Sequence, residues 1–337
     1  MVTPVTVSSL PFGATDLDPV LAAGLELGLD AVEAHLRETV KSDYPFVTEA
    51  SRHLVDAGGK RFRPLLVLLA AHLGDATAPE VIAAAVVVEL THLATLYHDD
   101  VMDEAPRRRG TESANARWDN TVAILTGDFL FAKASQILAD LGPDAVRIQA
   151  LTFERLCTGQ IRETVGPSEG EDPVEHHLRV LADKTGSLIA TSGRFGAMTA
   201  GADDLAVDVM TRFGERIGVA FQLADDLLDI GSDSQVSGKT VGTDLREGVR
   251  TLPALLALAS GAPADARLHE LLSRPIPDDS EHAEALALLR AHPAMEQARV
   301  EACRWADEAR AALGALPASS VRSALELLCD SVVSRTA

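Results

Sequence analysis

The chain has 337 residues and a formal charge of −20 at pH 7, with 47% apolar and only 4% aromatic residues. The negative charge argues against nucleic acid as a partner, because phosphate backbones attract basic faces. Alanine and leucine dominate and no segment alternates apolar and polar residues for long, so we expect an all-α protein. The three cysteines, Cys157, Cys303 and Cys329, lack metal-ligand spacing and indicate a reducing compartment.

The N-terminal residues 1–15 have neither the basic start nor the apolar centre of a signal peptide. We expect a disordered tail there, a single all-α domain over residues 16–337, and a cytoplasmic location. Gly58-Gly59 breaks the first helical region, and Arg63-Pro64 opens the helix that follows. Helical periodicity predicts helices over 16–40, 44–55, 64–73, 81–97, 113–141, 145–164, 174–201 with a break near Gly186 or Gly193, and 205–230, with further helices from Leu252 onward.

The apolar run from Val81 to Tyr97 is nearly long enough to span a bilayer. Glu89 and His92 lie inside it, and they favour a buried helix of a soluble protein over a transmembrane segment. The run ends in the acidic stretch HDDVMDE at 98–104.

Two carboxylates of that stretch, Asp99 and Asp103, are four residues apart, so a helix places them on one face. They repel each other unless a cation lies between them. One such triplet alone is most simply a solvated helix end. However, the spacing recurs in FQLADDLLD at 221–229, after a second apolar run. We therefore expect two helices whose carboxylate pairs face each other across a cavity, with hard oxygen ligands that suit Mg²⁺ and a phosphate-bearing substrate.

Basic residues accompany both acidic stretches. The loop GGKRFRP at 58–64 contains Lys60, Arg61 and Arg63. It delivers two or three cations to a helix N-terminus, where backbone N–H groups and the helix dipole favour an anion. RRRG at 107–110 follows the first triplet within residues 105–112, which we expect to form a polar, basic loop. Its guanidinium groups match phosphate oxygens. The simpler interpretations are a solvated basic turn for the first group and neutralisation of neighbouring aspartates for the second. The combination predicts a Mg²⁺-bridged diphosphate with an apolar tail as the ligand.

Five segments resemble the trans-isoprenyl diphosphate synthases, or polyprenyl synthetases, and they occur in that family's order. They are GGKRFRP at 58–64, HDDVMDEAPRRRG at 98–110, Lys184-Thr185, FQLADDLLD at 221–229 and GKTVGTDLREG at 238–248. The resemblance implies an all-α helical bundle of the isoprenoid synthase type around a central cavity, and a homodimer. It also implies that an allylic diphosphate is elongated by isopentenyl diphosphate, giving a product that is passed on to a membrane.

The same resemblance assigns roles to individual residues. Those implied to hold isopentenyl diphosphate are Lys60, Arg63, His92 and Arg109. Those implied to surround the reacting allylic diphosphate are Arg108, Lys184, Thr185, Gln222 and Lys239. Those implied to bind three Mg²⁺ ions are Asp99, Asp103 and Asp225 directly, and Asp100, Asp226 and Asp229 through waters. For His92 the simpler interpretation is a hydrogen-bonded core histidine. One departure is Val249, which stands where many members have lysine, and Arg250 is its candidate replacement.

Product length is expected to depend on the helix before the first triplet. Short-chain members carry large aromatic residues four and five positions before the first aspartate, where this chain has Thr95 and Ala94. Thr91 and Val88 further along are not bulky either. We therefore expect a product from hexaprenyl upward, with a farnesyl or geranylgeranyl diphosphate synthase as the alternative within the family. Two different classes of protein share some of these features. A class I terpene cyclase is opposed by the second aspartate triplet, and a non-catalytic regulatory subunit is opposed by the intact state of both triplets.

Overall fold

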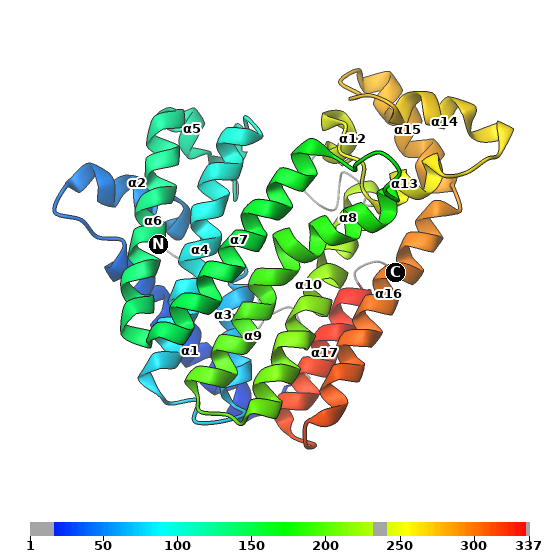
Figure 1. Ribbon diagram of the computed structural model, residues 1–337. Coiled ribbons are helices and arrows are strands. Elements are labelled where there is room, and N and C mark those ends of the chain that lie inside the picture. The colour runs from blue at the N-terminus through cyan, green and yellow to red at the C-terminus, as the bar shows by residue number, and fades with distance from the viewer. Residues whose placement is uncertain (1–16, 232–240, 335–337) are drawn as a thin grey trace. The chain divides into compact units, whose positions relative to one another are not determined.

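A computed structural model describes residues 17–231 and 241–334. Within these residues every regular element except one short hairpin is helical, which confirms the predicted all-α class (Figure 1). The predicted tail over 1–15 lies outside the described residues. The chain divides into two compact units, and the expectation of a single domain stays a prediction. Unit 1 comprises 1–154, 188–214 and 313–328, and unit 2 comprises 155–187, 215–312 and 329–337.

The central element of unit 1 is α4 (Pro79–Met102), whose side chains are buried around most of its circumference. It packs against α1, α3 and α6, and Figure 1 shows α4 and α6 running side by side. The helices that belong wholly or almost wholly to this unit are α1 (Pro19–Thr39), α2 (Pro45–Asp56), α3 (Phe62–Ala71), α4, α5 (Ala114–Arg117), α6 (Asn120–Leu141) and α9 (Ser187–Thr199). The predicted helices over 16–40, 44–55, 64–73 and 81–97 therefore exist, with ends shifted by a few residues.

Residues 105–112, expected to form a basic loop, contain a two-stranded hairpin instead. Strands β1 (Arg107–Arg108) and β2 (Thr111–Glu112) pair antiparallel, with Arg108 opposite Thr111. The two turn residues, Arg109 and Gly110, both have positive φ, at 51° and 78°. Such a turn matches the twist of a hairpin, but it is strained for a residue with a side chain. In this conformation the Arg109 side chain donates a hydrogen bond to the Leu54 carbonyl.

Unit 2 is organised around an apolar cluster that includes Val219, Leu223 and Leu227 of α10. Its described helices are α8 (Pro173–Leu181), α12 (Thr243–Glu247), α13 (Leu252–Leu258), α14 (Ala266–Leu272), α15 (Asp279–Ala291) and α16 (Ala294–Ala312). Single 3₁₀ turns lie at Pro263–Asp265 in unit 2 and at Leu313–Ala315 in unit 1. Three helices contribute residues to both units: α7 (Pro143–Val165), α10 (Asp204–Gly231) and α17 (Ser320–Ser334). The expected break near Gly186 is a π-helical turn, Ala182–Gly186, between α8 and α9.

Two helices of the described chain, α4 and α6, are long and apolar enough by composition to cross a bilayer. Core helices of soluble proteins meet the same test. In α4, 67% of the most apolar window is buried within the protein, and Glu89 lies there in an ion pair. These properties agree with the expectation of a protein-core helix for residues 81–97.

Close packing of α9 against α3 depends on Gly196. A Cβ atom at this position would lie 2.1 Å from the carbonyl oxygen of Val67 and 2.8 Å from the Cβ of Ala70. The obstacle is helix backbone, which cannot move aside locally.

We therefore expect Gly196→Ala to lower the free energy of unfolding by about 1–3 kcal/mol, as overpacking does. The matched control is Gly24→Ala in α1, where the new Cβ meets only His72 at 3.6 Å. The control should be stabilising by about 0.5–1 kcal/mol, because alanine favours a helix. Urea unfolding of both variants measures the difference, and equal effects would contradict the packing argument.

Candidate active site

The first aspartate triplet lies at the C-terminal end of α4. Asp99 is half-buried, and Asp103 is the exposed capping residue, whose N–H donates to the Asp99 carbonyl at 2.8 Å. The last turn of α4, which is fully described, contains no basic residue. Carboxylates at the negative end of a helix dipole raise the energy of the folded chain unless cations are supplied. This end of α4 is therefore a favourable place for a cation.

The middle residue of this triplet, Asp100, has an arginine partner. Its side chain is fully buried, and Arg108 donates from Nε to its Oδ1 at 2.6 Å. Burial raises the pKa of Asp100, and the Arg108 charge opposes that rise. Neutralisation of an aspartate, the simpler interpretation of the arginine run, thus applies to Arg108 in this structure. The role of Asp100 toward a metal stays a prediction.

The second triplet, in unit 2, repeats this arrangement at the end of α10. Asp225 and Asp229 are half-buried, whereas Asp226 is buried and accepts a hydrogen bond from Gln222 Nε2 at 3.0 Å. His177 Nε2 lies 3.7 Å from the second carboxylate oxygen of Asp226. None of the described last-turn residues of α10 is basic. Both triplets therefore have a buried middle aspartate between two more accessible ones.

A further carboxylate, Asp244 of α12, lies beside the second triplet, and the sequence did not indicate it as a site residue. Its N–H donates to Asp229 Oδ2 at 3.4 Å. Burial, followed by the charges of Asp226 and Asp229, raises the pKa of Asp244 to about 8. Burial also raises the pKa of Asp229. The only sequence signal was its place in the last motif, GKTVGTDLREG. This grouping of carboxylates again calls for positive charge.

The residues predicted around the allylic diphosphate in unit 2 are Lys184, Thr185, Gln222 and Lys239. Lys184 and Thr185 lie in the π-helical turn, a type of irregularity that is frequent at functional sites. Thr185 Oγ1 donates to Gln222 Oε1 at 3.3 Å, and Lys184 pairs with Glu163. Lys239 lies outside the described residues. Arg250, the candidate replacement for the missing lysine, is exposed and donates to the Ser273 carbonyl at 3.3 Å.

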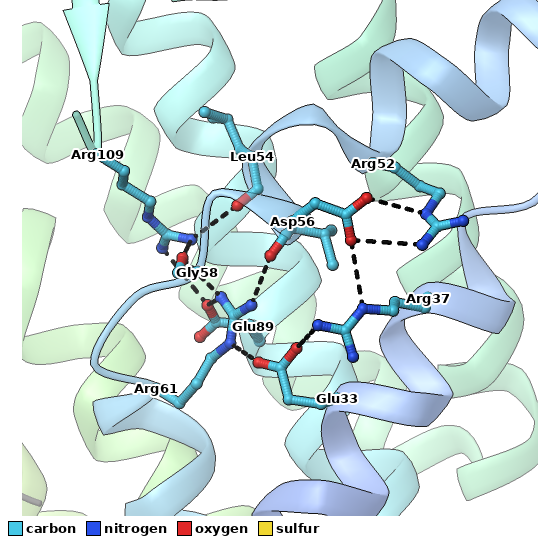
Figure 2. A network of polar contacts seen from close by, with 10 residues as sticks. Glu33, Arg37, Arg52, Leu54, Asp56, Gly58, Arg61, Glu89 and Arg109 are labelled. Atoms are coloured by element: carbon cyan, nitrogen blue, oxygen red, sulfur yellow. Dashed lines mark hydrogen bonds and ion pairs between the residues drawn. The ribbon is translucent and has the colours of Figure 1, made fainter. Parts of the chain in front are cut away.

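The basic loop at 58–64 contains one arginine that is structural. Arg61, in the left-handed conformation with φ 47°, points into the protein and is only 2% exposed. Its guanidinium donates to Glu33, to Glu89 at 2.8 Å and to the Val55 carbonyl at 2.9 Å (Figure 2). Arg61 is therefore not among the two or three cations that this loop is expected to present to an anion. The family resemblance implied only the other two cations of the loop, Lys60 and Arg63, as ligands.

In unit 1, the charges of Arg63 and Arg109 act on each other and on His92. Arg109 donates from Nη1 to the carbonyls of Leu54, at 3.1 Å, and Gly58, and its Nη2 is 3.5 Å from Glu89 (Figure 2). Burial, with a contribution from the Arg109 charge, lowers the pKa of Arg63 to about 10. Arg63 Nε has no hydrogen-bond partner among the described residues. Burial and the surrounding arginines keep the pKa of His92 well below its usual value, so this imidazole is neutral at pH 7.

The described residues contain no group of three His, Cys, Asp or Glu side chains arranged to hold a metal ion alone. The ends of α4 and α10 instead each offer the oxygens of two carboxylates spaced i, i+4. Mg²⁺ keeps several waters and is commonly bound by one or two carboxylates together with substrate phosphates. The donor set therefore fits a metal that arrives with a diphosphate better than a closed protein cage.

The all-α fold and the two helices that end in aspartate triplets agree with an enzyme that acts on isoprenoid diphosphates. The sequence matches the polyprenyl synthetase family over residues 44–289. The chain belongs to this family, which confirms the resemblance and the predicted class of enzyme, a prenyltransferase.

Individual relatives agree with that assignment over nearly the whole chain. The chain is 50% identical to a nonaprenyl diphosphate synthase of Mycobacterium tuberculosis, over 99% of each chain. A geranylgeranyl pyrophosphate synthase of Corynebacterium glutamicum, solved with calcium and isoprenyl diphosphate, is 47% identical at a TM-score of 0.86, covering 95% of this chain and 98% of that one. A decaprenyl diphosphate synthase of Rhodobacter capsulatus is 36% identical at a TM-score of 0.85, covering 94% and 99%.

The structural role of Arg61 is directly testable. Removing its side chain by Arg61→Ala leaves the carboxylates of Glu33 and Glu89 buried without their shared partner. Breaking a buried ion pair in this way typically costs about 3–5 kcal/mol. Arg107→Ala, at an exposed hairpin position, should change the free energy of unfolding by less than about 0.5 kcal/mol. Urea unfolding of the two variants measures this, and similar stabilities would refute the structural assignment.

Proposed function

We propose that this protein elongates an allylic diphosphate by head-to-tail condensation with isopentenyl diphosphate, with Mg²⁺ as the metal. The product is a medium- to long-chain all-trans polyprenyl diphosphate. The observation that carries this proposal is the pair of helices, α4 and α10, that each end in three aspartates without a basic residue in the described last turn. Such ends favour the binding of cations, and the cations favour a diphosphate.

In this proposal the triplets bind the metal that accompanies the allylic diphosphate. Asp99, Asp103 and Asp225 bind three Mg²⁺ ions directly, and Asp100, Asp226 and Asp229 assist through waters. When bound, the metal stabilises the negative charge that develops on the leaving diphosphate. Arg108, Lys184 and Lys239 add fixed positive charge, and Thr185 and Gln222 orient the group. Arg108 pairs with Asp100 and Lys184 pairs with Glu163, so both cationic side chains are already restrained before the substrate binds.

The second substrate is assigned to unit 1. Lys60, Arg63, Arg109 and the neutral His92 hold the diphosphate of isopentenyl diphosphate, which sets the distance and angle of its double bond. The double bond attacks the allylic cation, and a proton then leaves the new chain, with the released diphosphate as its acceptor. No side-chain nucleophile is required. The apolar residues of α4 keep water away from the cation.

Product length is proposed to depend on the small residues of α4. Ala94 and Val88 are buried and Thr95 is half-buried, so none of them presents a bulky floor. Tyr97, a large residue close to them on the same helix, points toward α2. Its hydroxyl donates to the Ala50 carbonyl at 2.6 Å and accepts from the Leu54 N–H at 3.2 Å. The names of the nonaprenyl and decaprenyl relatives support a product from hexaprenyl upward, and the geranylgeranyl relative represents the shorter alternative.

Three further expectations belong to this proposal. A homodimer is supported by exposed apolar side chains on α6, where Ile124 is 42% and Leu125 is 61% exposed. We also propose a cytoplasmic location and transfer of the product to a membrane, which the family match and the apolar nature of the product support. The intact triplets and the basic loop support a catalytic prenyl synthase over a terpene cyclase or a regulatory subunit.

The metal assignment is tested by Asp99→Ala and Asp225→Ala. Each should abolish Mg²⁺-dependent incorporation of labelled isopentenyl diphosphate while leaving the fold intact, because removing one of several mutually repelling carboxylates relieves repulsion. Asp30→Ala, an exposed aspartate of α1, is the matched control and should retain full activity. Activity near that of the wild type in either triplet variant at saturating Mg²⁺ would refute the assignment.

The channel assignment is tested by placing a phenylalanine on α4. Thr95→Phe, at a half-buried position about one turn before Asp99, should shorten the product sharply and leave the first condensation intact. Ala94→Phe should do the same. Leu96→Phe is the control, since Leu96 points about 150° around the helix from the direction midway between Ala94 and Thr95. Chromatography of the dephosphorylated products gives the lengths. A wild-type product that already stops at geranylgeranyl would contradict the prediction.

A further inference from the structure

The buried carboxylate of Glu89 lies in the middle of α4 and belongs to none of the motifs. It is 1% exposed and precedes Asp99 by ten residues, which is about 15 Å along a helix. It is therefore not a metal ligand of the first triplet. Burying a carboxylate is costly unless it is paired and hydrogen-bonded. The arrangement of its partners indicates what it does.

Glu89 contacts two arginines that differ in function. Its Oε1 accepts a hydrogen bond from Arg61 Nη1 at 2.8 Å and lies 3.5 Å from Arg109 Nη2 (Figure 2). Arg61 is structural, whereas Arg109 is proposed to bind substrate. One oxygen thus links the supporting arginine to a ligand arginine.

Glu33 provides a contrast from the opposite side of Arg61. It accepts from Arg61 Nε through one oxygen, and its other oxygen pairs with Arg37 at 2.9 Å. Arg61 therefore has a second carboxylate partner besides Glu89, so either partner alone still compensates its charge. The direct contact of Glu89 with Arg109 distinguishes the two glutamates.

The guanidinium of Arg109 is restrained on several sides. Its Nη1 donates to the Leu54 and Gly58 carbonyls at the end of α2, and its Nη2 faces Glu89. It also rests on Gly59, where a Cβ atom would come within 2.9 Å of its Cζ. Neighbouring Arg63 repels Arg109, and Glu89 is attracted to both. The carboxylate therefore allows two guanidinium groups to remain close together.

We infer that Glu89 is a positioning residue for isopentenyl diphosphate: it holds Arg109 in the orientation that receives the diphosphate. This inference rests on the proposed function. Removal of the charge has two opposing effects. A more positive cluster attracts the diphosphate more strongly, but Arg109 loses a direct partner and is repelled by Arg63. The direct contact dominates, because the attraction of an ion pair at 3.5 Å exceeds the effect of an added charge at longer range. A guanidinium that is already held in place also avoids an ordering cost when the diphosphate binds.

The first test compares Glu89→Gln with Glu33→Gln. Each removes one buried carboxylate from Arg61, but only the first removes the partner of Arg109. Glu89→Gln should raise the KM for isopentenyl diphosphate about tenfold or more, the equivalent of losing one partly buried ion pair. Its KM for the allylic primer and its kcat should change less than about twofold, and Glu33→Gln should leave all three within that range. Equal shifts in both variants, an unchanged KM or a lowered KM would overturn the inference.

The second test is a double-mutant cycle with Arg109→Ala. If Glu89 acts through Arg109, Glu89→Gln should raise the KM less than about twofold when Arg109 is already absent. Additive effects would overturn the inference. If Glu89→Gln does not fold, Glu89→Asp retains the charge and withdraws the carboxylate by one methylene. It should then raise the KM for isopentenyl diphosphate about threefold or more, since the contact with Arg109 lengthens.

The two proposals fail in different ways. Wild-type protein that incorporates no isopentenyl diphosphate would refute the proposed function. Active wild-type protein with an additive cycle would refute only the role of Glu89.

Discussion

The feature on which the rest of the site depends is negative charge placed where a helix least tolerates it. α4 and α10 each carry three aspartates at their C-terminal ends, where the helix dipole is itself negative, and the described last turns contain no basic residue. Burial adds to the effect, since it raises the pKa values of Asp100, Asp229 and Asp244. This arrangement of negative charge destabilises the folded protein when no cation is bound. It is explained if positive charge arrives with the substrate.

The positive charges of unit 1 are divided between support and binding. Arg61 is enclosed by two glutamates and a helix carbonyl, so its charge is compensated inside the protein. Arg63 is half-buried, and its Nε atom is buried and lacks a hydrogen-bond partner among the described residues. Burial lowers the pKa of Arg63 to about 10. A buried donor without an acceptor is unfavourable unless a ligand supplies one. The same network thus stabilises the loop at 58–64 and leaves anion-binding capacity next to it.

Sequence reasoning succeeded where a local pattern has one physical solution. The apolar run before Asp99 had to be a buried helix, Gly58-Gly59 had to break the chain, and the region near Gly186 departs from α-helical geometry as expected. The all-α class and the family followed from such patterns. The i, i+4 spacing did not reveal that Asp100 and Asp226 are more buried than their neighbours, because burial of the middle residue depends on packing.

What the sequence concealed depends on contacts between distant residues. The sequence alone does not distinguish Lys60, Arg61 and Arg63, because all three are basic. Only the ion pairs of Arg61 with glutamates of α1 and α4 show that it is structural. The hairpin at 107–112 is too short for a period-two pattern, so it was expected to be a loop. Asp244 lies fifteen residues after Asp229, and a separation of that length does not predict that its N–H bonds to the Asp229 carboxylate.

The central claim is that the aspartate triplets bind metal together with a diphosphate. Calorimetric titration of the full-length protein with Mg²⁺, with and without inorganic diphosphate, tests it most directly. The account predicts weak binding of Mg²⁺ alone and much tighter binding of several ions once diphosphate is present, lost in Asp99→Ala. Equally tight binding without diphosphate, or no binding with it, would contradict the account.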